Sequence, residues 1–185
     1  MNKNEIKIRI IIVGGEYTGK STFIKYIYDE NLEKSEYEMY QMTHNLSLLT
    51  KKFIYKNRIF SIDIFDTPGI EKYRRLLGII MKDSDVILFF YDPFDKESFE
   101  IVKELLNMSK EYCECNPILV LICNKYDLNM DKKAKNIIKD EEVLEYAEKN
   151  KLLFSHLSIF DKYEKGVNEL FIKILDKYIE NKNKI

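Results

Sequence analysis

The stretch IKIRIIIVGGEYTGKST, residues 6–22, decides the fold of this 185-residue chain. Its first eight residues are almost continuously apolar, which is typical of a strand that is covered on both faces of a parallel sheet. The segment GGEYTGKST then leads into a region with helical spacing. A strand, a glycine-containing turn and a helix in this order leave two alternatives, a loop that binds phosphate or a plain strand-to-helix turn.

The turn fits the pattern G-x-x-x-x-G-K-[ST] from Gly14 to Ser21, in the context that this motif requires. Gly14 and Gly19 allow the loop to turn its amide N–H groups inward around phosphate oxygens. Lys20 can reach the β and γ phosphates, the Ser21 hydroxyl can ligate Mg²⁺, and the helix presents its positive N-terminal end. The pattern therefore favours a phosphate-binding loop, with predicted nucleotide contacts from Gly15, Glu16, Tyr17, Thr18, Gly19, Lys20, Ser21 and Thr22.

A second motif, Asp66-Thr67-Pro68-Gly69, stands at the end of another predicted strand. The Asp66 carboxylate can hold a water of a Mg²⁺ shell, and the Gly69 N–H can contact a γ-phosphate. Taken alone, the same residues are typical of a Pro-Gly turn that closes a strand. After a phosphate-binding loop, they favour the metal and phosphate roles.

A third motif, Asn124-Lys125-Tyr126-Asp127, follows the apolar run ILVLIC directly. The Asp127 carboxylate can accept two hydrogen bonds from the N1–H and exocyclic amine of guanine, whereas adenine offers no such donor pair. Leaving buried polar groups unpaired discriminates strongly against the wrong base, so this motif favours GTP over ATP. Taken alone, the N-K-x-D motif is as typical of a polar turn as of a nucleotide-binding site. An ATP-using kinase is disfavoured because Asp127 would then have no role.

The rest of the chain predicts a three-layer α/β domain. Further strands are expected at ILFFY (87–91), ILVLIC (118–123) and LLF (152–154). Two segments have helical spacing and should each bury an apolar stripe on the sheet: one has Phe99, Val102, Leu105 and Leu106, and the other has Val167, Leu170, Phe171, Ile174, Leu175 and Tyr178. In NLSLLTKKFIY and RIFSIDIFD, Phe60, Ile62 and Ile64 alternate with Ser61 and Asp63, which predicts one antiparallel hairpin that reverses at residues 56–58. We expect residues 1–185 to form a single domain whose ligands bind beyond the carboxyl ends of the strands.

Composition limits the partners and the compartment. Thirty Lys and Arg against 31 Asp and Glu give a net charge of −1, which removes the electrostatic argument for nucleic acid. Three cysteines do not make a disulfide framework, and no apolar run is long enough to span a membrane, so we expect a cytoplasmic protein. Asn at position 2 and a C-terminal NKNKI without Cys predict no direct lipid anchor, so partners would recruit the chain to membranes or complexes.

The three motifs, in this order and spacing, resemble those of the small GTPases of the Ras superfamily, most closely the Rab branch. The segments DVILFFYDPFDKESFE (85–100) and KGVNELFIKIL (165–175) are also similar to Rab sequences. The resemblance implies the P-loop small GTPase fold, with a six-stranded, mostly parallel sheet, and binding of GTP or GDP with Mg²⁺. It further implies that switch I, about residues 33–45, and switch II, about residues 67–82, contact effector, exchange-factor and activating proteins.

By the same resemblance, Thr43 is the switch I threonine, which would complete a Mg²⁺ shell with Ser21 and a water held by Asp66. An ordinary loop threonine is the alternative, because SEYEMYQMTHNL lacks the T-I-G sequence usual in Rab proteins. The catalytic group implied by the family consists of Lys20, Thr43 and Gly69.

The segment Leu157-Ser158-Ile159-Phe160 stands where the family usually has T-S-A-K. The resemblance implies nucleotide contacts from Ser158, Ile159 and Phe160. The stacking lysine of that family motif is absent, so Lys125 would cover the guanine ring largely alone.

Two other departures bear on activity. Ile70 replaces the glutamine that usually orients the attacking water, which predicts slow intrinsic hydrolysis. Glu16 either repels phosphate or helps to place the water. We therefore expect a GTPase that acts as a molecular switch and is weak without a partner. The alternative is a GTP-binding scaffold or assembly module that does not hydrolyse GTP.

Overall fold

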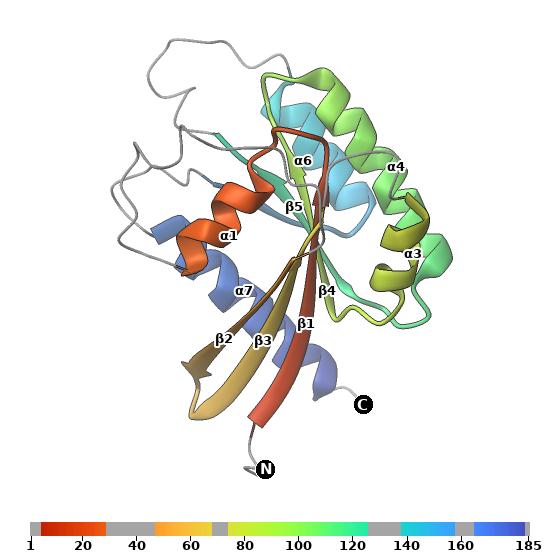
Figure 1. Ribbon diagram of the computed structural model, residues 1–185. Helices are drawn as coiled ribbons and strands as arrows, with labels where there is room; N and C mark the ends of the chain where they lie inside the picture. Colours follow the sequence, from red (N-terminus) through yellow and green to blue (C-terminus); the bar gives the residue numbers. More distant parts are fainter. Residues whose placement is uncertain (1–4, 29–46, 68–73, 126–137, 158–164, 184–185) are drawn as a thin grey trace.

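A single twisted sheet with helices on both faces organises the chain (Figure 1). The computed structural model describes residues 5–28, 47–67, 74–125, 138–157 and 165–183. Its strand order is β2-β3-β1-β4-β5-β6, with β2 and β3 antiparallel and the other neighbours parallel. The strands are β1 (Glu5–Gly14), β2 (Ser47–Tyr55), β3 (Arg58–Asp66), β4 (Val86–Tyr91), β5 (Ile118–Cys123) and β6 (Leu153–His156). This is the predicted α/β fold with its six-stranded sheet and one hairpin.

The helices divide between the two faces of the sheet (Figure 1). One face packs against α1 (Lys20–Tyr28) and α7 (Lys165–Lys182). The other face packs against α3 (Arg74–Lys82), α4 (Lys96–Tyr112) and α6 (Asp140–Lys149). None of the helices within the described ranges is both long and apolar enough to cross a membrane.

Strand β1 lies between β3 and β4, and both of its faces are buried. Ile8, Ile10 and Ile12 belong to the core beneath α1 and α7, whereas Ile11 and Val13 belong to the core beneath α3, α4 and α6. Each of these side chains is at most 1% exposed. Because a strand directs successive side chains to opposite faces, the part of a strand that is covered on both sides is apolar at successive positions. The uninterrupted apolar run of β1 from Ile10 to Val13 is the consequence, whereas Lys7 and Arg9 lie in the less buried first half of the strand.

The hairpin of β2 and β3 closes at Lys56 and Asn57, where both residues have positive φ values, 47° and 58°. Turns of this kind match the right-handed twist of the strands that they join. Tyr55 pairs with Arg58 across the turn, so the chain reverses within residues 56–58, where the sequence predicted the reversal. Ser61 is buried, in contrast to the simple alternation expected, because β3 lies inside the sheet with β1 on its other side.

Gly14 ends β1 in a conformation that favours glycine, with φ at +149°, and a Cβ built there would lie 2.3 Å from the Phe90 backbone oxygen. We predict that Gly14→Ala lowers the free energy of unfolding by about 3 kcal/mol, through overpacking and backbone strain. Urea denaturation measures this loss. Gly166→Ala is the matched control, because a Cβ there makes only ordinary contacts, with Leu157 Cδ2 at 3.4 Å and the His156 backbone oxygen at 3.9 Å. Equal effects of the two substitutions would contradict the prediction.

Candidate functional site

Parallel pairing brings the ends of β1, β3, β4 and β5 to one edge of the sheet. Ile12 pairs with Asp66, Gly14 with Phe90, and Tyr91 with Cys123. The glycine-rich loop, the start of the second motif and the start of the third motif therefore lie at the same edge. This edge is where ligands bind in open α/β sheets.

The loop at residues 14–19 wraps around the side chain of Lys20, the first residue of α1. Lys20 is 6% exposed, and its Nζ donates hydrogen bonds to the backbone oxygens of Gly14 (3.0 Å) and Gly15 (2.6 Å). The Thr18 hydroxyl also donates to the Gly15 oxygen, at 2.9 Å. Tyr17 adopts a left-handed φ of 57° and is 70% exposed, so its bulky ring stays out of the loop interior.

Lys20 shares its surroundings with oxygen groups. Burial lowers the pKa of Lys20 to about 8, and the carboxylates of Asp66 and Glu16 partly oppose this shift. Burial raises the pKa of Asp66, while a hydrogen bond from Ser21 and the charge of Lys20 lower it. An ammonium, a hydroxyl and carboxylates thus stand together at the positive end of α1.

These groups fit a magnesium-bound polyphosphate. The Asp66 Oδ1 atom is buried and has no hydrogen-bond partner among the described residues. An oxygen of this kind can accept a hydrogen bond from a metal-bound water, and hydroxyl and carboxylate oxygens suit Mg²⁺. The residues that would hold the ion are Ser21 and Asp66.

Asn124 joins the third motif to the phosphate loop. Its side chain is 2% exposed, and its Nδ2 donates to the Thr18 backbone oxygen at 2.8 Å. Its Oδ1 is buried without a hydrogen-bond partner among the described residues. Lys125 follows with a left-handed φ of 59°, and its Nζ lies 2.6 Å from the Asp92 Oδ2 atom. The end of β5 therefore contacts both the loop and the residue that follows β4.

Further contacts fix the loop against its neighbours. The Thr67 hydroxyl donates to the Ile12 oxygen at 2.6 Å, which ties the end of β3 to β1. A Cβ at Gly15 would lie 3.2 Å from the Ile101 Cδ1 atom, so the loop approaches α4 closely. A larger side chain at Gly15 would press the loop away from α4.

The predicted site residues divide into two groups. The structure brings together the loop residues, Ser21, Asp66, Asn124 and Lys125 at one edge of the sheet, and Thr22 lies in the first turn of α1. The others lie outside the described residues: Thr43, Gly69, Asp127, Ser158, Ile159 and Phe160.

Asp92 is a site residue that the sequence reasoning missed. It directly follows β4, and its carboxylate contacts Lys125. A signal was present in the sequence, because a polar residue that directly follows a buried strand stands at the ligand-binding edge of the sheet. Asn124 was identified through its N-K-x-D motif, and Asp92 has the same position relative to its own strand but lies outside the three motifs.

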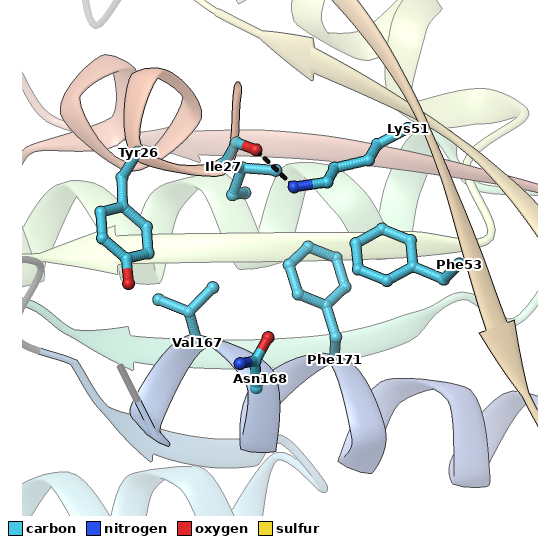
Figure 2. A pocket seen from close by; sticks show the side chains of 7 residues that line it. All are labelled: Tyr26, Ile27, Lys51, Phe53, Val167, Asn168 and Phe171. Carbon is cyan, nitrogen blue, oxygen red and sulfur yellow. Dashed lines mark hydrogen bonds between the residues drawn. The ribbon is translucent and has the colours of Figure 1, made fainter. Parts of the chain in front are cut away.

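A separate pocket lies between α1, β2 and α7 (Figure 2). Its volume of about 30 Å³ has room for one or two water molecules and not for a nucleotide. Lys51 enters it from β2, and its Nζ donates to the Ile27 backbone oxygen at 2.7 Å. Its lining residues are Tyr26, Ile27, Lys51, Phe53, Val167, Asn168 and Phe171, none of which is a predicted site residue. The Lys51 hydrogen bond joins β2 to the end of α1, and the pocket lies apart from the predicted site residues.

The lowered pKa of Lys20 predicts how the free energy of unfolding depends on pH. The pKa falls from its usual value of 10.5 to about 8 in the folded chain. Between these values the unfolded chain binds more protons, so the contribution of Lys20 to the free energy of unfolding rises with pH through this window. Below the folded pKa the full cost of the buried charge remains.

We therefore expect the wild type to gain roughly 2 kcal/mol relative to Lys20→Met when the pH is raised from about 7 to about 9.5. Urea denaturation of nucleotide-free wild type and variant at the two pH values measures the difference. Titration of other groups affects both proteins alike and cancels. If the free energies of unfolding of wild type and variant change equally between the two pH values, the result would contradict the burial of a charged Lys20.

Comparison with known proteins identifies the family. The chain matches the Ras family over residues 9–180. It is 28% identical to the Ras-related protein RabH of Dictyostelium discoideum over 99% of this chain and 87% of that protein. It is 26% identical to the Ras-related protein Rab-21 of Geodia cydonium, over 95% of this chain and 72% of the relative. It is 28% identical to the Ras-related protein Rab-7b of Mus musculus, over 80% of this chain and 77% of that relative. These matches confirm the resemblance to Rab proteins, and the chain belongs to the Ras family of small GTPases.

Proposed function

We propose that this chain binds GDP and GTP with Mg²⁺ at the ends of β1, β3 and β5 and acts as a molecular switch with slow GTP hydrolysis. The observation that carries the proposal is the buried Lys20 ammonium at the start of α1, with Ser21 and Asp66 beside it. Burial makes the charge of Lys20 costly, and a phosphate would restore its pKa by direct attraction. The loop is therefore suited to an anion.

The residues of this edge have distinct roles in the proposal. Lys20 and the N–H groups at the start of α1 bind the phosphates and stabilise the negative charge that develops during phosphoryl transfer. Ser21 and Thr43 would hold Mg²⁺ directly and Asp66 through water, and the bound ion would neutralise charge on the phosphate oxygens. The Gly69 N–H would contact the γ-phosphate.

Recognition of guanine uses the ends of β5 and β6. Asn124 fixes the loop through its bond to Thr18. We assign the reading of the guanine edge to Asp127 and the cover of the ring to Lys125. Ser158, Ile159 and Phe160 follow β6 in the chain and would add contacts to the base.

Regulation would act through the two switch segments, about residues 33–45 and about residues 67–82. These segments would bind effectors, exchange factors and activating proteins and respond to the γ-phosphate. Ile70 cannot orient a water by hydrogen bonding, so hydrolysis would be slow until a partner supplies the missing group. Membership of a family of GTPases does not favour the alternative of a non-hydrolysing module.

Lys20→Ala tests the binding site. We expect nucleotide-stripped wild type to bind GDP and GTP in isothermal titration calorimetry, and the variant to bind both at least about a hundredfold more weakly, through loss of a charge-assisted contact. Lys25→Ala is the matched control, because Lys25 is an exposed residue of the same helix. No heat from either nucleotide with folded wild type would overturn the proposed function.

Ile70→Gln tests the cause of slow hydrolysis. We expect single-turnover phosphate release to accelerate roughly tenfold or more, because the amide can orient the attacking water. The control is Ile172→Gln, which changes an isoleucine that is 44% exposed on α7 and should leave the rate unchanged. An unaltered rate in the Ile70 variant would mean that another group limits the reaction. Release no faster than background in the wild type would favour the non-hydrolysing module.

A further inference from the structure

The carboxylate of Asp92 faces the ammonium of Lys125 at the edge of the proposed guanine site. We propose that Asp92 is a positioning residue: it holds Lys125 in the orientation that covers the guanine ring, and bound nucleotide is retained through this charge pair. The inference rests on the proposed function and adds to it a residue that the three sequence motifs do not contain.

The geometry of the pair is specific. Lys125 Nζ lies 2.6 Å from Asp92 Oδ2, and the two side chains are 33% and 13% exposed. The other carboxylate oxygen, Oδ1, accepts a hydrogen bond from the Phe94 backbone N–H at 2.9 Å. Since one oxygen is held by the backbone, the second has a fixed direction. Lys125 is thus bound to an oriented acceptor.

Asp92 is itself held on a rigid support. The Asp92 N–H donates to the Ser98 hydroxyl at 3.0 Å, and that hydroxyl donates to the Asp95 oxygen at 2.7 Å. Ser98 is 1% exposed, in the first turns of α4. Its Cα would lie 3.6 Å from a Cβ built on Gly15. The start of α4 therefore supports the phosphate loop and the partner of Lys125 together.

The backbone of Lys125 shows the same constraint. Its φ of 59° is uncommon for a residue other than glycine, asparagine or aspartate. The backbone and the end of the side chain are therefore both fixed, although a lysine side chain otherwise has many rotamers. Fixing these rotamers before a ligand arrives lowers the entropy cost of binding.

The Asp92–Lys125 pair should affect nucleotide retention more in this chain than it would in a chain with a second lysine to stack on the guanine ring. Phe160 stands at the position of the lysine that the family motif supplies, so Lys125 is the cation expected to cover the ring. Partial exposure screens the pair, and its effect on binding should be modest. The opposite reading is that Asp92 draws Lys125 away from the base. It predicts that loss of the carboxylate slows nucleotide release.

Asp92→Asn separates these readings. The amide oxygen can still accept from the Phe94 N–H, while the charge that faces Lys125 is lost. We expect a fluorescent GDP analogue to dissociate about fivefold faster than from the wild type. Asp83→Asn is the matched control, because Asp83 is a 71% exposed aspartate before β4, and it should leave the rate unchanged.

A double-mutant cycle shows whether Asp92 acts through Lys125. In a Lys125→Met background, Asp92→Asn should produce no further acceleration. Asp92→Glu keeps the charge and should hold GDP within about twofold of the wild type. The thermal unfolding of each variant is measured together with its rate of GDP release, to show that the variant is folded.

The outcomes are distinct. Four results would each overturn the positioning role. GDP release from the Asp92→Asn variant could be unchanged or slower, Asp92→Asn could accelerate release equally in the Lys125→Met background, or Asp92→Glu could release GDP as fast as Asp92→Asn. In the last two cases Asp92 would serve only the local fold. A wild type that does not bind the GDP analogue would overturn the proposed function itself and this inference with it.

Discussion

The burial of one ammonium group constrains the rest of the site. Lys20 is almost fully covered, and the oxygens of Gly14 and Gly15 accept its hydrogen bonds. To place those oxygens around the side chain, β1 must end in a sharp turn and α1 must begin at once. The turn needs glycine where the chain passes the Phe90 backbone, and the helix start provides the positive end for an anion. The neighbouring strand ends then have to meet this loop.

Much of the fold could be predicted from hydrophobic runs. β1, β4 and β5 were predicted to within one residue, because strands buried on both faces leave continuous apolar segments. The last strand was expected at 152–154 and extends over Leu153–His156, where polar residues end the run. Helix α6 was not predicted, since Val143 and Ala147 are its only fully buried residues. The burial of Ser61 depends on which strand lies beside β3, and a single strand's alternation does not contain that information.

The arrangement of the candidate site was predictable where one segment contains its residues and less so where contacts join distant segments. The glycine-rich loop is local, and its pattern placed Lys20 and Ser21 at the start of α1. The contact of Asn124 with Thr18 joins residues 106 positions apart, and that of Lys125 with Asp92 joins residues 33 positions apart. Both arise because β1, β4 and β5 are parallel neighbours. Strand order, which no single motif specifies, therefore determines these partners.

The charges around Lys20 would determine how the proposed nucleotide binding depends on Mg²⁺. The carboxylates of Glu16 and Asp66 both support the charge of Lys20. A bound phosphate would attract the same ammonium, so Glu16 would lose part of its favourable interaction and come close to a second anion. Mg²⁺ held by Ser21 and Asp66 would offset this repulsion by adding positive charge. Glu16 should therefore make nucleotide binding more dependent on Mg²⁺ than a neutral residue would. In the proposed function, hydrolysis would face a different limit, because an isoleucine at position 70 cannot donate or accept a hydrogen bond with the attacking water and carries no charge. In the proposed function, a partner that supplies the group missing at Ile70 would therefore raise the rate of hydrolysis without altering the phosphate loop.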